Sequence, residues 1–179
     1  MANAAYRARA LAALAELGAD PAILKRRKLP LHAEAHSLLC VGVGTDGRDK
    51  FLAPAAARAW AAMREAAGAD GVNLLLVSAF RSFEFQQVLI RGKLAKGRSI
   101  EEVLEVNAPP GCSEHHSGRA VDIGSHGTPP LEEAFEETEA FTWLSRNAGR
   151  FAFTLSYPRG NAEGYLYEPW HWCWHAAIA

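Results

Sequence analysis

The chain has 179 residues, 49% of them hydrophobic and 22% charged, which is typical of a soluble globular domain. Its 19 basic and 20 acidic residues give a formal net charge of -1, and the densest basic run, 25–28, is short, whereas nucleic-acid binding needs a broad basic surface. No stretch reaches the roughly 20 apolar residues of a membrane span, and three cysteines without regular spacing argue against a disulfide-rich scaffold.

We expect a single domain over residues 1–179, with an N-terminal helical cover over 1–30 and a motif-bearing core over 72–174. Charged residues interrupt the N-terminal segment, so no signal peptide is seen there. The sequence therefore predicts a cytoplasmic protein, or a periplasmic or extracellular one if a leader was removed. Nothing in it indicates a partner protein.

Helices are predicted wherever apolar residues recur with helical spacing between capping or breaking residues. The first covers 3–17, where Tyr6, Ala10 and Leu14 share one face, and Gly18 ends it. Ser99 and Glu102 fit a capping box at the start of a short helix. The further predicted helices are 54–67, 83–94, 99–106 and 132–149.

Strands are predicted for the short apolar or alternating runs 38–41, 72–77, 120–123, 151–155, 165–168 and 170–174, the last two bent at Pro169. Helices and strands follow one another without βαβ regularity. We therefore predict an α+β fold with a small, largely antiparallel sheet flanked by helices.

The stretch 112–123 carries the densest chemistry in the chain, since it brings His115, His116, Glu114 and Asp122 together around Gly118. Imidazole and carboxylate groups are the ligands of a catalytic zinc, which takes three protein groups and leaves a position open. From spacing alone, a polar loop with surface histidines remains an equal alternative.

A third ligand can come from residues 167–172, where His171 follows Glu168 at a distance of three residues. Together the two segments supply three ligands and one additional carboxylate, which is the set of groups found in a zinc hydrolase. In a straight strand these two side chains would face opposite ways, so a local bend at Pro169 is expected.

Four blocks of the sequence carry a resemblance to a known family. Residues 113–122 are similar to the SxHxxGxAxD signature of the VanY-like D-alanyl-D-alanine carboxypeptidases, and 168–171 match its EPWH motif. Residues 78–82, with Gln86 after them, resemble the S-G-Y-R-S block, and 151–158 resemble the G-F-x-L-R-Y-P block. The blocks occur in the family's order, and the resemblance implies the α+β fold shared with Hedgehog-type domains.

The resemblance also implies roles for individual residues. His115, Asp122 and His171 would bind Zn²⁺, and Glu168 would be the general base on the zinc-bound water. Arg81 would hold the substrate and polarise the scissile carbonyl. The candidate substrate-binding residues are Ser113 (for the terminal carboxylate), Gln86, Ser78 and Trp170.

The function implied is a zinc-dependent carboxypeptidase that removes the C-terminal D-alanine of a peptidoglycan stem peptide or muropeptide, with D,D-specificity favoured. An L,D-carboxypeptidase acting on tetrapeptides shares these motifs. A closed structural zinc site made by Cys112, His115, His171 and Cys173, and a silent cell-wall-binding domain, are the alternatives of another class. Both leave Glu168 without a task.

The chain departs from the family pattern at three places. Phe80 replaces the usual tyrosine, Ser156 stands where arginine is common, and 172–174 replace a basic-aromatic run. We expect these departures to affect the choice of substrate more than the binding of metal.

Overall fold

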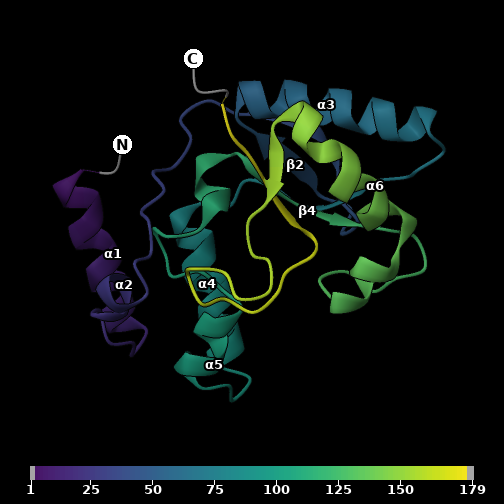
Figure 1. The fold of residues 1–179 in the computed structure, drawn as a ribbon. Coiled ribbons are helices and arrows are strands. Elements are labelled where there is room, and N and C mark those ends of the chain that lie inside the picture. Colours follow the sequence, from purple (N-terminus) through teal and green to yellow (C-terminus); the bar gives the residue numbers. More distant parts are fainter. Residues whose placement is uncertain (1–2, 177–179) are drawn as a thin grey trace.

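The computed structural model describes residues 3–176, which form the α+β fold drawn in Figure 1. The α-helices in this part of the chain are α1 Ala4–Glu16, α2 Ile23–Arg26, α3 Pro54–Ala69, α4 Phe83–Leu94, α5 Ile100–Glu105 and α6 Glu139–Asn147. The strands are β1 Leu39–Val43, β2 Asp49–Leu52, β3 Leu75–Ser78, β4 Ala120–Gly124, β5 Phe153–Leu155 and β6 His171–Trp174. Short 3-10 helices are η1 Glu114–Ser117, η2 Glu133–Glu137 and η3 Ala148–Phe151. The predicted fold class is confirmed.

The central sheet has four antiparallel strands in the order β3-β4-β6-β5, and β1 and β2 form a separate hairpin. In the register of the sheet, Asp122 of β4 lies opposite His171 of β6 on one side and Ser78 of β3 on the other. The pairing of β4 with β6 therefore places Asp122, from the middle of the chain, next to His171, from its C-terminal segment.

Two hydrophobic cores cover the two faces of this sheet. On one face α3 and α6 bury Trp60, Met63 and Leu144 against Val121 and Trp172 of the central strands. On the other side α1, α2, α4 and α5 form a second core, and Figure 1 shows these helices on the opposite side of β4 from α3 and α6. Because side chains alternate along a strand, Asp122 and His171 face the second core.

The predicted helix boundaries hold where the sequence carries caps. The Ser82 hydroxyl accepts a hydrogen bond from the amide of Phe85 at the start of α4, and Ser99 and Glu102 form the predicted capping box of α5. The segment 132–149 is corrected, because η2 and α6 are separate helices. Thr138 between them has an extended backbone, and its hydroxyl caps α6.

The strands predicted at 72–77, 151–155 and 170–174 are longer than the observed β3, β5 and β6, whereas β1 and β4 are each one residue longer than predicted. The strand predicted at 165–168 is absent, because the side chain of Asn161 bonds both the amide and the carbonyl of Tyr165 and so takes the place of a ladder partner. The strand predicted at 151–155 begins only at Phe153, after Ala152 with φ 61°. Strand β2 was not predicted.

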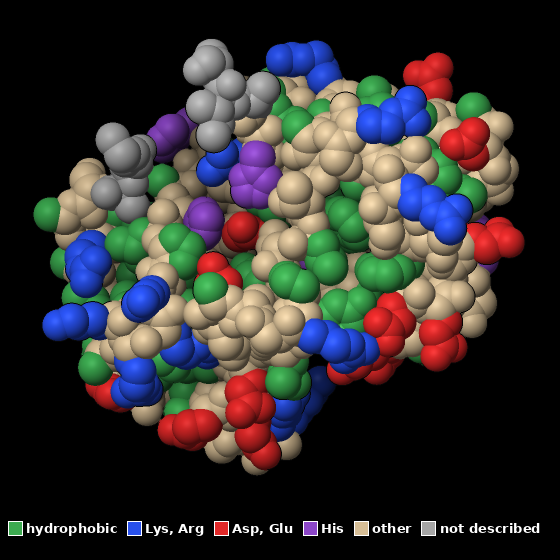
Figure 2. Space-filling model, viewed as in Figure 1, with side chains coloured by type: hydrophobic (Ala, Val, Ile, Leu, Met, Phe, Trp, Pro, Cys, Tyr) green, Lys and Arg blue, Asp and Glu red, His purple; other side chains and the backbone are tan. Residues whose placement is uncertain are grey.

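The surface of the molecule is mixed in charge. On the face shown in Figure 2, basic side chains gather over α1 and α2, and acidic side chains lie among and below them. Within residues 3–176, every helix is too short or too polar to cross a bilayer.

Candidate active site

Three elements bring the candidate metal ligands together: η1 carries His115, β4 carries Asp122 and β6 carries His171. Gly118 makes the turn from η1 into β4 with φ 65°, a left-handed conformation that favours glycine. A Cβ at this position would lie 2.9 Å from the amide nitrogen of Ala53. The turn therefore needs glycine both for its dihedral angle and for close backbone packing.

The ligand atoms of His115, Asp122 and His171 all lie within 4.8 Å of one another, and all three residues are buried. Asp122 Oδ2 is 3.2 Å from His115 Nε2, and Asp122 Oδ1 is 3.0 Å from His171 Nδ1. The two imidazole rings are nearly perpendicular, with centroids 4.9 Å apart. Two nitrogens and a carboxylate thus converge on one point, as a catalytic zinc requires.

The hydrogen bond of His115 Nδ1 determines that Nε2 is the nitrogen that faces Asp122 and His171. His115 Nδ1 lies 2.6 Å from the carbonyl oxygen of Ala79 and donates its proton there. Nε2 is then left with its lone pair, and it is buried without a hydrogen-bond partner. An unpartnered buried imidazole nitrogen beside a carboxylate is the observation that best fits a metal ligand.

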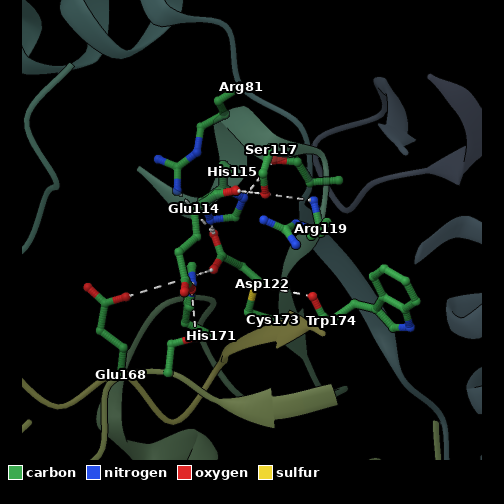
Figure 3. A network of polar contacts seen from close by, with 12 residues as sticks. Arg81, Glu114, His115, Ser117, Arg119, Asp122, Glu168, His171, Cys173 and Trp174 are labelled. Atoms are coloured by element: carbon green, nitrogen blue, oxygen red, sulfur yellow. Dashed lines mark hydrogen bonds and ion pairs between the residues drawn. The ribbon is translucent and has the colours of Figure 1, made fainter. Parts of the chain in front are cut away.

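Glu114 belongs to this cluster, and its role was missed in the sequence. Its Oε2 lies 2.9 Å from His171 Nε2 and accepts a 2.6 Å hydrogen bond from the Ser156 hydroxyl. Figure 3 shows Glu114 reaching His171 beside Asp122. The sequence did contain a signal for this role, because Glu114 places a second carboxylate directly before His115.

The two carboxylates impose positive charge on His171. Burial alone lowers the pKa of His171, but hydrogen bonds to Asp122 and Glu114, with the charges of both acids, raise it to about 10. Burial opposes ionisation of Glu114 as well, yet His171 and Ser156 lower its pKa to about 2. A divalent cation at Nδ1 would satisfy the same demand for positive charge.

Glu168 lies at the edge of the cluster, with Oε2 3.9 Å from His171 Nδ1. The His171 amide donates to the Glu168 carbonyl over 3.1 Å, which closes a turn at Pro169. This is the predicted bend, and it brings both side chains to the same side. Burial raises the pKa of Glu168 to about 7 and outweighs the charge of His171, which lowers it; the charge of Asp122 adds to the rise.

Arg81 approaches the same cluster from the loop after β3. Its Nη2 lies 3.7 Å from Asp122 Oδ2, and its buried Nε has no hydrogen-bond partner. The backbone carbonyl of Arg81 is bonded to His116 Nδ1 over 2.6 Å, and His116 Nε2 accepts from the amide of Gly111. Both ring nitrogens of His116 are therefore engaged by backbone groups, so this histidine shapes the loop.

Two cavities are lined by the candidate metal ligands, and they differ in size and lining. A small one of about 30 Å³ is lined by His115, His171, Glu168 and Arg81 together with Gln86 and Ser113. A larger one of about 390 Å³ is lined by Arg81, Asp122, Glu168 and Trp170, among others. Ser78 lines neither; it lies at the end of β3 opposite Asp122.

The cysteines take no part in the cluster as the structure has it. Across residues 3–176, the only group of three or more potential metal ligands is His115, Asp122 and His171. Cys112 is buried in the second core, and Cys173 contacts the carbonyl of Trp174. The geometry thus favours an open three-ligand site over a closed one that uses both cysteines.

Comparison with known proteins identifies the family. The sequence profile described as "VanY: D-alanyl-D-alanine carboxypeptidase" matches residues 49–177. The chain belongs to the VanY family.

Among curated relatives, YodJ of Bacillus subtilis (strain 168) is 34% identical over 155 residues, covering 82% of this chain and 56% of the relative. A D-alanyl-D-alanine carboxypeptidase of Enterococcus faecalis is 36% identical over 118 residues, covering 60% and 42%. The chain thus spans about half the length of these two relatives.

Three solved structures share the fold of this chain. The LdcB LD-carboxypeptidase superposes with a TM-score of 0.70 at 32% identity, covering 81% of this chain and 71% of that one. VanYB in complex with D-alanine-D-alanine gives 0.61 at 29% identity, covering 78% and 77%. A VanY D,D-pentapeptidase variant in complex with Zn(II) gives 0.58 at 26% identity, covering 80% and 86%.

Proposed function

We propose that this chain is a zinc-dependent carboxypeptidase that removes the C-terminal D-alanine from a peptidoglycan stem peptide. One observation carries the proposal: two imidazole nitrogens and a carboxylate converge within 4.8 Å, with Glu168 beside them. The family supports the same reaction class, since its profile is that of a D-alanyl-D-alanine carboxypeptidase.

His115, Asp122 and His171 would hold the zinc through Nε2, the carboxylate and Nδ1. When bound, zinc supplies Lewis acidity and makes a water molecule nucleophilic at neutral pH. The residues fit this ion, because Nε2 of His115 has no other partner and because the acids around His171 require a compensating positive charge.

Glu168 is the general base in this proposal. Its carboxylate lies outside the three-ligand set but within 3.9 Å of His171, so it can accept a proton from the attacking water. The same group can then pass the proton to the leaving amine. Burial raises the pKa of Glu168 in the metal-free site, and a bound zinc would lower it again, so the group would be ionised and able to accept a proton at neutral pH.

Arg81 and Ser113 are proposed to orient the peptide. The guanidinium of Arg81 has an unpaired donor at the cluster and can hydrogen-bond the scissile carbonyl as negative charge develops there. Ser113 lines the small cavity together with Gln86, whose Oε1 is also unpartnered. The polar lining of this cavity, next to the candidate metal ligands, suits the C-terminal end of a peptide.

Glu114 is proposed as the residue that positions His171. A carboxylate that accepts the proton of the outer ring nitrogen fixes the tautomer and directs the other nitrogen at the metal. In this chain Glu114 accepts from His171 Nε2, and Ser156 donates to the same oxygen. The family departure at Ser156 therefore has a structural consequence beside the metal ligands.

D,D-Specificity is the first proposal, and L,D-specificity is the second because of the similarity to LdcB, named an LD-carboxypeptidase. Incubating the purified, zinc-loaded protein with pentapeptide and tetrapeptide precursors, followed by mass spectrometry, tests both. Release of alanine from the pentapeptide supports the first, and release from the tetrapeptide supports the second. The Glu168→Gln variant is the control for hydrolysis by a contaminant, and failure of both peptides would refute the proposed function.

A further inference from the structure

The larger cavity extends from the candidate active site, and cationic side chains are prominent in its wall. It shares Arg81, Asn107 and Glu168 with the small cavity and continues past Lys93 and Arg98. Lys93 comes from the last turn of α4, and Arg98 lies between α4 and α5. Three positive groups from separate positions of the chain thus surround one space.

Within the described residues, neither Lys93 nor Arg98 has an acidic partner within 4.0 Å. Lys93 Nζ donates to the side-chain oxygen of Asn107 over 3.1 Å, and Arg98 donates to a backbone carbonyl over 3.5 Å. Burial lowers the pKa of Lys93, and the charges of Arg98 and Arg81 lower it further. The charge of Glu168 acts in the opposite sense but forms no ion pair with Lys93 or Arg98, so an anion bound between these two cations would stabilise both.

The acids of this cavity do not fill that role. Asp122 contacts His115 and His171 in the ligand cluster, and Glu168 lies beside His171. Glu132 lines the cavity at the start of η2 and is exposed. The cationic end of the cavity therefore remains available to a negatively charged ligand.

We propose that Lys93 and Arg98 form a subsite for a substrate carboxylate upstream of the scissile bond. This inference rests on the proposed function: Ser113 and Gln86 place the C-terminal residue at the small cavity, and the upstream peptide is assigned to the larger cavity, which shares Arg81 and Glu168 with the small one. The carboxylate is assigned to a side chain, as in a stem peptide whose third residue is a diamino acid with a free acid group. The C-terminal carboxylate is the other source of the same chemistry.

The test uses three peptides that differ only at the third residue, which is diaminopimelate, its side-chain amide or lysine. We expect the wild-type protein to cleave the first with a kcat/KM about tenfold higher than the other two, the effect of one charge-assisted hydrogen bond. In Lys93→Met and Arg98→Met this preference falls to about twofold or less, with the rate on the lysine peptide unchanged. Lys96→Met is the matched control, because Lys96 is exposed and does not line the cavity.

Each other outcome overturns the inference. Equal rates of the wild type on all three peptides refute the subsite and leave the proposed function intact. An equal loss on all three peptides in Lys93→Met assigns the cations to the C-terminal carboxylate and refutes the side-chain assignment. Absence of hydrolysis of every peptide by the wild type refutes the proposed function itself. Thermal unfolding of each variant checks that the fold is retained.

Discussion

The hydrogen bond between Glu114 and His171 gives the sharpest quantitative prediction. In Glu114→Ala the Nε2 proton of His171 loses the carboxylate oxygen that accepts it at 2.9 Å. Water cannot readily replace that oxygen, because the side chain of His171 is 3% exposed and the side chain of Glu114 is 15% exposed. A hydrogen bond to a charged group contributes about 1.5–3 kcal/mol. Loss of such a partner of a metal ligand costs about 10-fold to 100-fold in affinity, or roughly 1.4–2.8 kcal/mol, so the two magnitudes agree. We expect the zinc dissociation constant to rise by about 10-fold to 100-fold.

The assay is a competition titration of the apo protein against a chromophoric zinc chelator at fixed pH. Glu114→Gln keeps an acceptor oxygen and should lie at the lower end of the range or below it, which separates positioning from loss of packing. Glu163→Gln is the matched control. Glu163 and Glu114 both line a separate cavity of about 240 Å³, but Glu163 makes no contact with His171 within hydrogen-bonding distance. Wild-type zinc affinity in Glu114→Ala, with an unchanged apo melting temperature, would refute the positioning role.

Three further predictions concern the metal, the base and the turn. After dialysis, metal analysis of His171→Ala should find less than one zinc ion per protein, whereas Glu168→Gln should keep its zinc and lose at least 100-fold in kcat. Zinc retained by His171→Ala, or wild-type turnover by Glu168→Gln, would contradict the assignment. A free zinc concentration of 100 times the dissociation constant stabilises the folded protein by about 2.7 kcal/mol, so removing the zinc with a chelator should lower the melting temperature by roughly 5 to 11 °C in scanning fluorimetry. An unchanged melting temperature would contradict zinc binding to the folded state. Gly118→Ala should destabilise the protein by more than about 2 kcal/mol in denaturant unfolding, because backbone strain adds to the 2.9 Å contact with Ala53. Gly127→Ala is its control, having φ 79° but open space around it, with about 1 kcal/mol expected from strain alone.

The sequence predicts the ligand cluster because each of its members lies in a short motif with distinctive chemistry. His115 and Asp122 are seven residues apart on either side of Gly118, and His171 follows Glu168. The structure brings these four residues together, although nothing in the spacing itself dictates how near the two segments lie. That proximity follows from the pairing of β4 with β6, which is a long-range feature of the sheet.

The contacts behind the ligands could not be read from the sequence. Ser156 and Glu114 are 42 positions apart, and the hydrogen bond between them depends on how the segment after β5 lies against η1. The strand prediction at 165–168 was wrong for a similar reason. Its aromatic and apolar residues favour a strand, but the side chain of Asn161 takes the backbone groups that a neighbouring strand would need.

The register of β4 and β6 is the feature on which both the core and the candidate site depend. Asp122 lies opposite His171, and the neighbouring pair, Val121 and Trp172, faces the core under α3 and α6. A slip of one residue would move Trp172 toward the ligand cluster and His171 into an apolar core. Such a slip would bury an imidazole without partners and place an indole beside the carboxylates of the ligand cluster, at a cost of several kcal/mol. The hydrophobic side of the sheet thus holds the strand alignment that brings an imidazole from the C-terminal segment to the carboxylate in the middle of the chain.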